Sequence, residues 1–349
     1  MKRLAVVLLL LAATSFAADR VQFTLNTSEA EAVLAIADKQ AGGKPVLDAD
    51  WQQLFASEPY LRLKKREASM HRDFTDDDFK RFVLSPELGA NAAALRRTLE
   101  EWKKADLKAT AGRILPYLPS TAMVRAKVYP MIKPQHNSFV FETTSADPAI
   151  FLYLDPKTPQ AEFENIVAHE SHHIGFADAG RQYDERIKAL PEHAQQAAEW
   201  MGAFGEGLAV LAAAGSVDVH PMRDFANEDR VRWDLDMKYV DRELDEVNQF
   251  FTDTVDGGFA NPEVANHVGM IFMGYRGPWY TVGYQMGSLI EKRYGRAVLI
   301  ECMADPRQLL ATYNQLAQEQ NAGGRAIKLP LWNPKVLEAV KAEVAAGAR

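Results

Sequence analysis

The chain has very little cysteine. Cys302 is the only cysteine among 349 residues, so no disulfide can form within the chain and a small disulfide-stapled fold is excluded. The same count excludes metal sites built from two or more thiolates and leaves histidine and carboxylate side chains as ligands. Cys302 lies in the apolar stretch 298–303, and we expect it to pack in the core.

Long apolar runs are absent from the sequence after its first 17 residues. Residues 1–17 have Lys2 and Arg3 directly after Met1, continue with the apolar stretch 4–13 and end in Ser15-Phe16-Ala17, a pattern typical of a secretory signal peptide. The apolar stretch is too short to span a membrane comfortably. We therefore expect a periplasmic or secreted protein without a stable membrane anchor.

The sequence also lacks an excess of basic residues. It has 40 Lys and Arg against 47 Asp and Glu, a formal net charge of −7, which becomes −9 when the two cations of the signal peptide are removed. An acidic chain has no general attraction for nucleic acid or anionic lipid. We therefore expect neither as a partner, and the oligomeric state is left open.

Apolar periodicity predicts an α+β fold in which helices dominate. A helical N-terminal region over residues 18–120 is expected to precede a catalytic domain over residues 121–349. Helices are predicted at 28–40, 48–56, 75–84, 91–107, 191–214, 228–253, 278–294 and 305–321. A small sheet is predicted from strands at 123–132, 138–143 and 149–154. The basic run 62–66 falls between two predicted helices, and we interpret it as a solvated face rather than a binding patch.

The segment His169-Glu170-Ser171-His172-His173 carries most of the functional information. On a helix, side chains four residues apart lie on one face, so His169 and His173 are placed to share a Zn²⁺ ion. Glu170 then lies beside the metal, where it can accept a proton from water as a general base. His172 is displaced around the helix and is expected to be a bystander or a supporting group.

A catalytic zinc site needs a third protein ligand. The pattern with glycine and histidine three and six residues after the second ligand is not met, because Phe176 and Ala179 stand there. Glu206 is the favoured candidate, because three neighbouring glycines (Gly202, Gly205 and Gly207) suggest a helix that packs closely against the His169 helix. Glu199, seven residues earlier on roughly the same face, is the alternative.

These motifs resemble the gluzincin metallopeptidases, the thermolysin type, and most closely bacterial families of zinc-dependent peptidases. The resemblance covers roughly residues 120–315 and includes a later Tyr- and Gly-rich helix over 278–287. It implies a zincin-like fold, a Zn²⁺ cofactor held by His169, His173 and Glu206, and a peptide or protein substrate. The chain departs from the N-E-x-x-E and E-x-x-x-D forms of the third-ligand helix, which makes Glu206 less secure than the histidines.

The expected reaction is attack of an activated water on an amide carbonyl. The developing oxyanion needs a donor, for which Tyr280 is the candidate, with Tyr284, His220 and His267 as competitors. An extended peptide is expected to pair with an edge strand of the sheet, either 149–154 or its neighbour. Two alternatives stay open: a zinc amidase that acts on a non-peptide or cell-wall substrate, and a binding protein with a vestigial site.

Overall fold

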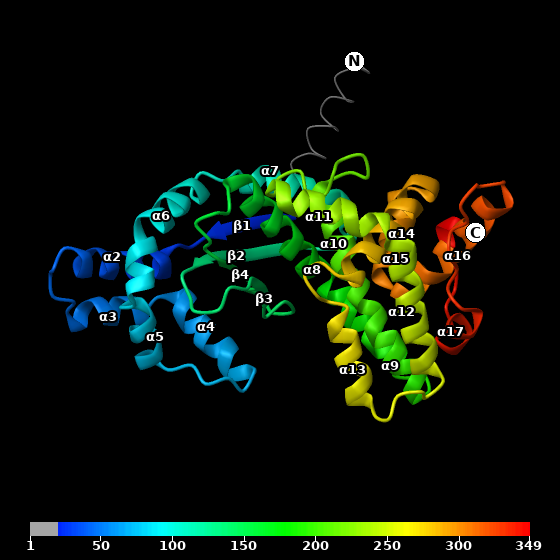
Figure 1. Cartoon of the computed structure of the whole chain (residues 1–349), viewed down its shortest axis with the longest axis horizontal. Coiled ribbons are helices and arrows are strands. Elements are labelled where there is room, and N and C mark those ends of the chain that lie inside the picture. Colours follow the sequence, from blue (N-terminus) through cyan, green and yellow to red (C-terminus); the bar gives the residue numbers. More distant parts are fainter. Residues whose placement is uncertain (1–19) are drawn as a thin grey trace, which may run out of the picture. The chain divides into compact units, whose positions relative to one another are not determined.

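The computed structural model describes residues 20–349, so the predicted signal peptide lies outside the described part of the chain. A four-stranded sheet has the order β1-β2-β4-β3 (Figure 1). Its strands are β1 (Val21–Leu25), β2 (Val124–Met131), β3 (Phe139–Phe141) and β4 (Ala149–Tyr153). The first three strands in this order run parallel, whereas β3 is antiparallel to β4. The three predicted strands are confirmed, and β1 is an addition.

The chain divides into two units. Among the described residues, the first comprises 20–112 and Met123–Ile174, and the second comprises Arg113–Ala122 and Gly175–Arg349. This division differs from the predicted boundary at residue 120, because β1 in the N-terminal region pairs directly with β2. The N-terminal helices and the sheet therefore share one unit.

Helices cover the sheet within the first unit. They are α2 (Ser28–Ala41), α3 (Asp48–Phe55), α4 (Glu58–Ser69), α5 (Asp76–Val83) and α6 (Pro86–Trp102), followed by α7 (Leu107–Ile114). Leu63 of α4 packs in a cluster with Tyr129, Met131 and Phe151 of the sheet. The predicted helices 28–40, 48–56 and 75–84 are confirmed, whereas the helix predicted at 91–107 is shifted to 86–102. The helices α4 and α7 were not predicted, and the basic run 62–66 lies inside α4 and not between helices. Its interpretation as a solvated face is wrong for Arg62, whose side chain is 11% exposed.

The second unit is helical. Its helices are α9 (Glu192–Met201), α10 (Gly205–Ala214), α11 (Asn227–Lys238), α12 (Val240–Val255), α13 (Pro262–Ile271), α14 (Pro278–Tyr294), α15 (Arg296–Ala304), α16 (Pro306–Ala322) and α17 (Pro334–Ala339). The prediction of one helix over 191–214 is wrong, because the 3₁₀ turn Gly202–Phe204 separates α9 from α10. The predicted helix 228–253 is likewise divided, at Tyr239.

Aromatic side chains fill the core of the second unit. The indole of Trp279 is fully buried and contacts the rings of Trp200, Phe204, Phe250 and Phe251. Cys302 belongs to the same core, as predicted, and is also fully buried. Such close packing of large rings gives the helices that surround Trp279 a fixed arrangement.

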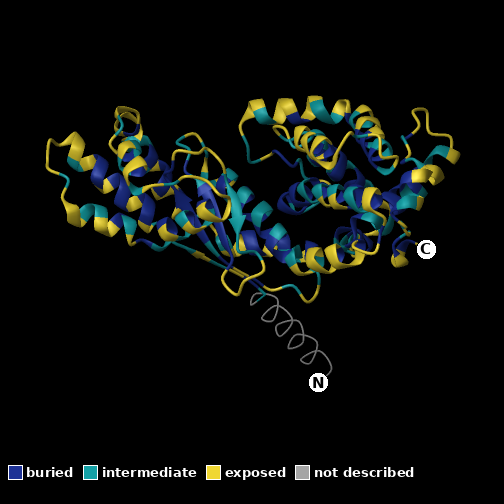
Figure 2. Cartoon of the chain, turned by 90° about the horizontal axis from the view of Figure 1, so that it is seen from below, coloured by how far each residue is buried: buried dark blue, intermediate teal, exposed yellow. Residues whose placement is uncertain are grey.

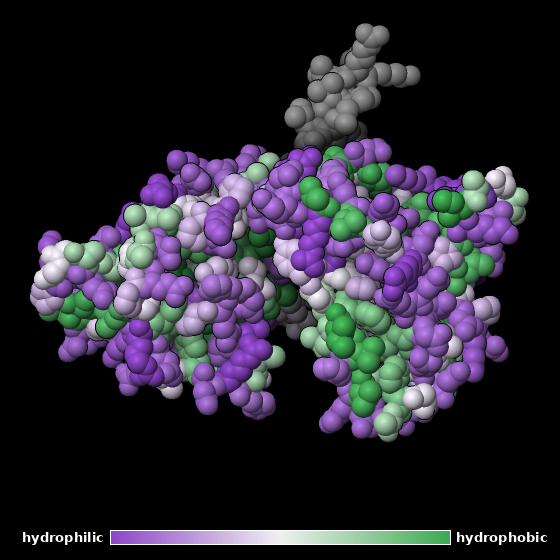
Figure 3. All heavy atoms as spheres, in the orientation of Figure 1, coloured by the Kyte–Doolittle hydropathy of each residue, from purple (hydrophilic) through white to green (hydrophobic). Residues whose placement is uncertain are grey.

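The long helix α8 (Gln160–Ile187) follows β4 and carries the His169 motif. The α+β prediction with dominant helix and a small preceding sheet is thus confirmed. The inner faces of the helices are buried and their outer faces exposed within each unit (Figure 2). An exposed apolar patch on α13 includes Val264, Met270 and Ile271 (Figure 3). Across residues 20–349, every helix is too short or too polar to cross a membrane.

Candidate metal centre

The start of α8 is anchored to the end of α6. The ring of Phe163 stacks on the indole of Trp102 with 4.4 Å between centroids and 24° between planes. The Nε1–H of Trp102 donates to the carbonyl of Thr158 at 3.0 Å, just before the helix begins. Both aromatic side chains are buried. Two contacts of different kinds therefore fix the direction in which α8 leaves the sheet.

His169 and His173 project from one face of α8, as their spacing predicts. Their Nε2 atoms are 3.2 Å apart, and their rings are nearly perpendicular, at 80°. Both residues are half-buried, so they are partly removed from water yet accessible. His172 points elsewhere: it is 3% exposed, and its ring centroid lies 6.3 Å from that of His173.

Glu206 comes from the first turn of α10. The position of this helix is set by Gly207, where an added Cβ would lie 2.2 Å from the Tyr280 carbonyl oxygen and 2.3 Å from the Tyr284 nitrogen of α14. Gly283 of α14 meets the carbonyl of Phe204 in the same way. The prediction that these glycines allow close contact with the His169 helix is wrong, because the close backbone contact is with α14. Gly202 and Gly205 have open space around them.

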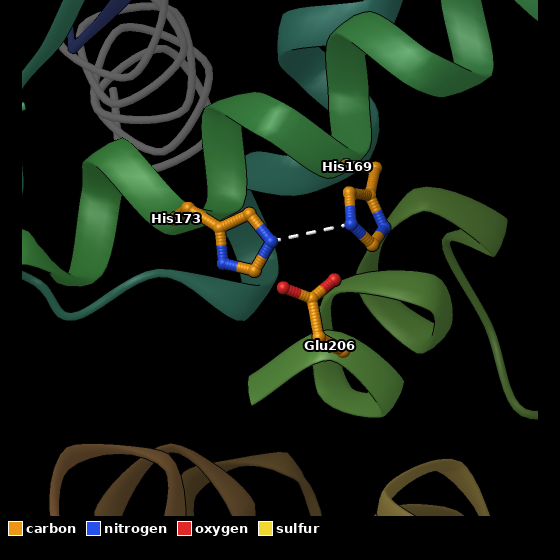
Figure 4. Close-up of side chains that lie close together, drawn as sticks. All are labelled: His169, His173 and Glu206. Atoms are coloured by element: carbon orange, nitrogen blue, oxygen red, sulfur yellow. Dashed lines mark hydrogen bonds between the residues drawn. The ribbon is translucent and has the colours of Figure 1, made fainter. Parts of the chain in front are cut away.

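The structure brings the three predicted ligands together. The ligand atoms of His169, His173 and Glu206 all lie within 4.8 Å of one another, and both rings and the carboxylate point toward a common centre (Figure 4). Two ligand atoms of a tetrahedral zinc ion, each 2.0–2.1 Å from the metal, are about 3.3–3.4 Å apart. The measured 3.2 Å between the Nε2 atoms is close to this value, so the donor set fits Zn²⁺. Within residues 20–349, no other three His, Cys, Asp or Glu side chains form such a group.

Three of the alternative site residues, Glu199, His220 and His267, lie outside the group of three ligands. Glu199 is exposed on α9 and accepts a hydrogen bond from the Gln195 amide at 2.9 Å. His220 lies 2.9 Å from the Asp234 carboxylate, and His267 is exposed on α13. Glu199 is therefore not part of the three-residue group, whose carboxylate is that of Glu206.

Glu170 and Tyr280 are both half-buried. Glu170 follows His169 directly on α8, as the motif requires. Tyr280 lies on α14 and packs in a cluster with Val210, which is one helical turn beyond Glu206 on α10. Tyr284 belongs to the same cluster, where its ring meets the indole of Trp233 edge-on at 5.3 Å. Burial raises the pKa of Tyr284 above its ordinary value.

The two edge strands of the sheet are β1 and β3, and β3 is the closer of the two to α8 in the sequence. The strand β4 lies between β2 and β3, so both of its edges are paired and residues 149–154 cannot receive a peptide. That option is therefore excluded, and the neighbouring strand β3 provides the open edge. Its length of only three residues, shorter than the predicted 138–143, is typical of an edge strand.

Comparison with protein families gives a match over most of the chain. Residues 51–322, which include α8, α10 and α14, match the model of a family described as "putative zinc dependent peptidase (DUF5700)". No curated protein and no solved structure matches the chain. The match covers more than half of the sequence and includes all three candidate zinc ligands. The chain therefore belongs to this zinc-dependent peptidase family.

Proposed function

We propose that the protein is a gluzincin-type metallopeptidase whose Zn²⁺ is held by His169, His173 and Glu206. The observation that carries this proposal is the convergence of two Nε2 atoms 3.2 Å apart with a carboxylate from a second helix. When bound, zinc supplies a Lewis acid that acidifies a water molecule and polarises a carbonyl group. Two imidazoles and one carboxylate leave a fourth position for these ligands, as in catalytic sites.

Glu170 acts as the general base in this proposal. Its carboxylate takes a proton as the water oxygen forms a bond to the carbonyl carbon of the substrate. The same proton then passes to the leaving nitrogen, the C–N bond breaks, and the Glu170 carboxylate is restored. Tyr280 donates a hydrogen bond to the oxyanion that develops on the carbonyl oxygen. Its place in the cluster beside Val210, one turn from Glu206, supports this role.

The substrate is a peptide that pairs with the open edge of β3. Main-chain hydrogen bonds along a strand recognise any extended peptide, and side-chain pockets add selectivity. We further propose that residues 1–17 direct export, so that the enzyme meets its substrate in the periplasm or outside the cell.

The test is hydrolysis of a mixed peptide library, with cell-wall fragments assayed in parallel. We expect the zinc-loaded protein to cleave peptides and the Glu170→Gln variant to keep its zinc while turnover falls by at least about 10³-fold, since the base is lost. Cleavage of cell-wall amides alone would favour the amidase alternative. A Glu170→Gln variant as active as the wild type would refute the proposed mechanism.

A further inference from the structure

The strand β3 has a backbone that is held in place from one side only. It pairs with β4 through Phe139, Val140 and Phe141, and it is the last strand in the sheet. A three-residue strand with one partner has few hydrogen bonds to define its shape. If β3 receives the substrate, something else must fix the position of its open edge.

The residue directly after this strand, Glu142, has an unfavourable backbone conformation. Glu142 follows Phe141 and has a φ of 55°, in the left-handed region that non-glycine residues rarely adopt. Its carbonyl accepts a hydrogen bond from the Ser145 amide at 2.9 Å, which closes the turn after β3. Such backbone conformations persist only where the surrounding contacts impose them.

Two basic residues of α4 contact the Glu142 carboxylate. The guanidinium of Arg62 donates to the Glu142 carboxylate at 2.6 Å, and the Lys65 ammonium pairs with the other carboxylate oxygen. Arg62 also donates to the Asp147 carbonyl at 2.7 Å and to the Tyr129 hydroxyl at 3.2 Å. Arg62 thus contacts both ends of the 142–148 loop, which connects β3 to β4, and joins this loop to β2. The Lys65 and Arg62 cations hold the pKa of the Glu142 carboxyl below its usual range, so it stays charged.

The same helix contacts the other end of β3. The guanidinium carbon of Arg66 lies over the ring of Phe139, 4.0 Å from its centroid. The Arg66 guanidinium donates a hydrogen bond to the Glu67 carboxylate at 2.5 Å, and the Glu67 side chain is only 3% exposed. The basic residues of α4 therefore hold β3 at its first residue and just past its last.

We propose that α4 sets the position of the open β3 edge, with Arg62 as the positioning residue that acts through Glu142. This inference rests on the proposed function, because it assumes that a peptide substrate pairs with β3. Arg62 does not touch the reacting atoms. Loss of its contacts lets the end of β3 relax, so that long substrates bind less well while the chemistry at the metal centre is unchanged.

The experiment compares Arg62→Ala with Arg96→Ala. Arg96 is a matched control, because it also bridges helices of the first unit, through Asp38 at 2.5 Å and the Leu34 carbonyl at 3.2 Å, but it does not contact β3. A peptide that the wild type cleaves is shortened from both ends until only the residues around the scissile bond remain. KM and kcat are measured for the longest and the shortest peptide, together with zinc content and hydrogen exchange of residues 138–143.

We expect Arg62→Ala to raise KM for the longest peptide about tenfold and to leave kcat, zinc content and the shortest peptide unchanged. Hydrogen exchange over residues 138–143 should be faster in Arg62→Ala than in the wild type. Arg62→Lys should show a smaller rise in KM than Arg62→Ala, since Lys keeps the charge but loses the planar fork of donors. Arg96→Ala should behave as the wild type. An unchanged KM for the longest peptide, or an equal rise for the shortest, would overturn the inference.

A second variant covers the case in which Arg62→Ala does not fold. Glu142→Gln removes the charge that Arg62 and Lys65 hold but leaves the contacts of Arg62 to Asp147 and Tyr129 intact. It should give the same selective rise in KM, and an unchanged KM would again overturn the inference. A wild type that binds zinc but cleaves no peptide would instead refute the proposed function, so the two failures are distinguishable.

Discussion

At the scale of single residues, the two imidazoles of α8 are arranged as metal ligands. Their Nε2 atoms face each other at 3.2 Å, although each ring is half-buried and could turn toward water. Two nitrogens at this distance either share one proton or bind one cation. The carboxylate of Glu206 in the same group favours the cation, because it supplies negative charge where a shared proton needs none.

Tyr280 provides a prediction at the residue scale. Replacement of Tyr280 by Phe removes only the hydroxyl group, so the packing with Val210 should persist. Loss of one oxyanion donor typically lowers kcat by about 10²–10³-fold. We expect a fall of this size for the Tyr280→Phe variant in steady-state peptide hydrolysis, with zinc content unchanged.

Tyr284→Phe is the matched control, since Tyr284 lies one turn later in the same cluster. Its ring packs on Trp233, and its variant should keep wild-type kcat. A loss of activity in Tyr284→Phe with none in Tyr280→Phe would reassign the oxyanion donor to Tyr284.

At the scale of secondary-structure elements, the crossing of α10 and α14 determines where Glu206 lies. The two helices meet at Gly207 and Gly283, where the absence of side chains allows backbone-to-backbone contact. Because Glu206 directly precedes Gly207, any shift of α10 away from α14 moves the proposed third ligand as well. Three glycines near one glutamate were a visible signal, but their partner helix could not be identified from the sequence.

A methyl group at residue 207 tests this crossing. The added Cβ would lie 2.2 Å from the Tyr280 carbonyl oxygen, which is backbone and cannot rotate away. Overpacking of this kind costs about 1–3 kcal/mol of stability. We expect a cost at the upper end of this range, because the neighbouring atoms belong to the backbone. We expect Gly207→Ala to lower the free energy of unfolding by about 3 kcal/mol, as measured by urea denaturation.

Gly205→Ala is the control for this prediction, because nothing lies within 4 Å of a Cβ at that position. Alanine is favoured over glycine in a helix by about 1 kcal/mol, so this variant should be as stable as the wild type or more so. Equal stability of the two variants would show that the helices do not meet as described.

At the scale of the whole molecule, a buried ionisable group makes the free energy of unfolding depend on pH. Glu29 is fully buried, and this burial raises the pKa of its carboxyl to about 8, although the Ile132 amide donates to it at 3.1 Å. Between about pH 5 and 8 the unfolded chain ionises this group while the folded chain keeps it protonated. The folded state then binds more protons, so stability falls as the pH rises through this window.

We expect the urea midpoint of the wild type to fall from pH 5 to pH 8 relative to that of Glu29→Gln, which cannot ionise. Burial also lowers the pKa of Lys133 to about 8, but this group changes stability above pH 8, where the unfolded chain is still charged and the folded one is not. The difference between the wild-type and Glu29→Gln profiles well below pH 8 therefore reports mainly on Glu29. Parallel pH profiles for the two proteins would contradict the assignment.

Much of the architecture could be predicted because its signals are local. The predicted helix 278–294 coincides with α14, and the three predicted strands differ from β2, β3 and β4 by a few residues. The His169 motif fixes its own geometry, since helical spacing alone places both rings on one face. Glu206 followed from the neighbouring glycines, and the structure brings it to the two histidines.

The features that escaped prediction depend on contacts between distant residues. The strand β1 pairs with β2 about a hundred residues later, and five residues with one partner give little pattern of their own. The basic run in α4 has the composition of a solvated face, but the contacts of Arg62 with Glu142 and Asp147 leave its side chain only 11% exposed. No local rule indicates that a charged residue will be covered by a loop eighty residues away.

The central claim is that His169, His173 and Glu206 together bind one zinc ion, and metal analysis tests it most directly. Zinc per chain is measured by atomic spectroscopy for the wild type, His173→Ala, Glu206→Ala and the control Glu199→Ala, whose carboxylate is exposed. We predict about one zinc per chain in the wild type and in Glu199→Ala, and almost none in the other two variants. Zinc retained by Glu206→Ala, or lost from Glu199→Ala, would contradict the assignment of the third ligand.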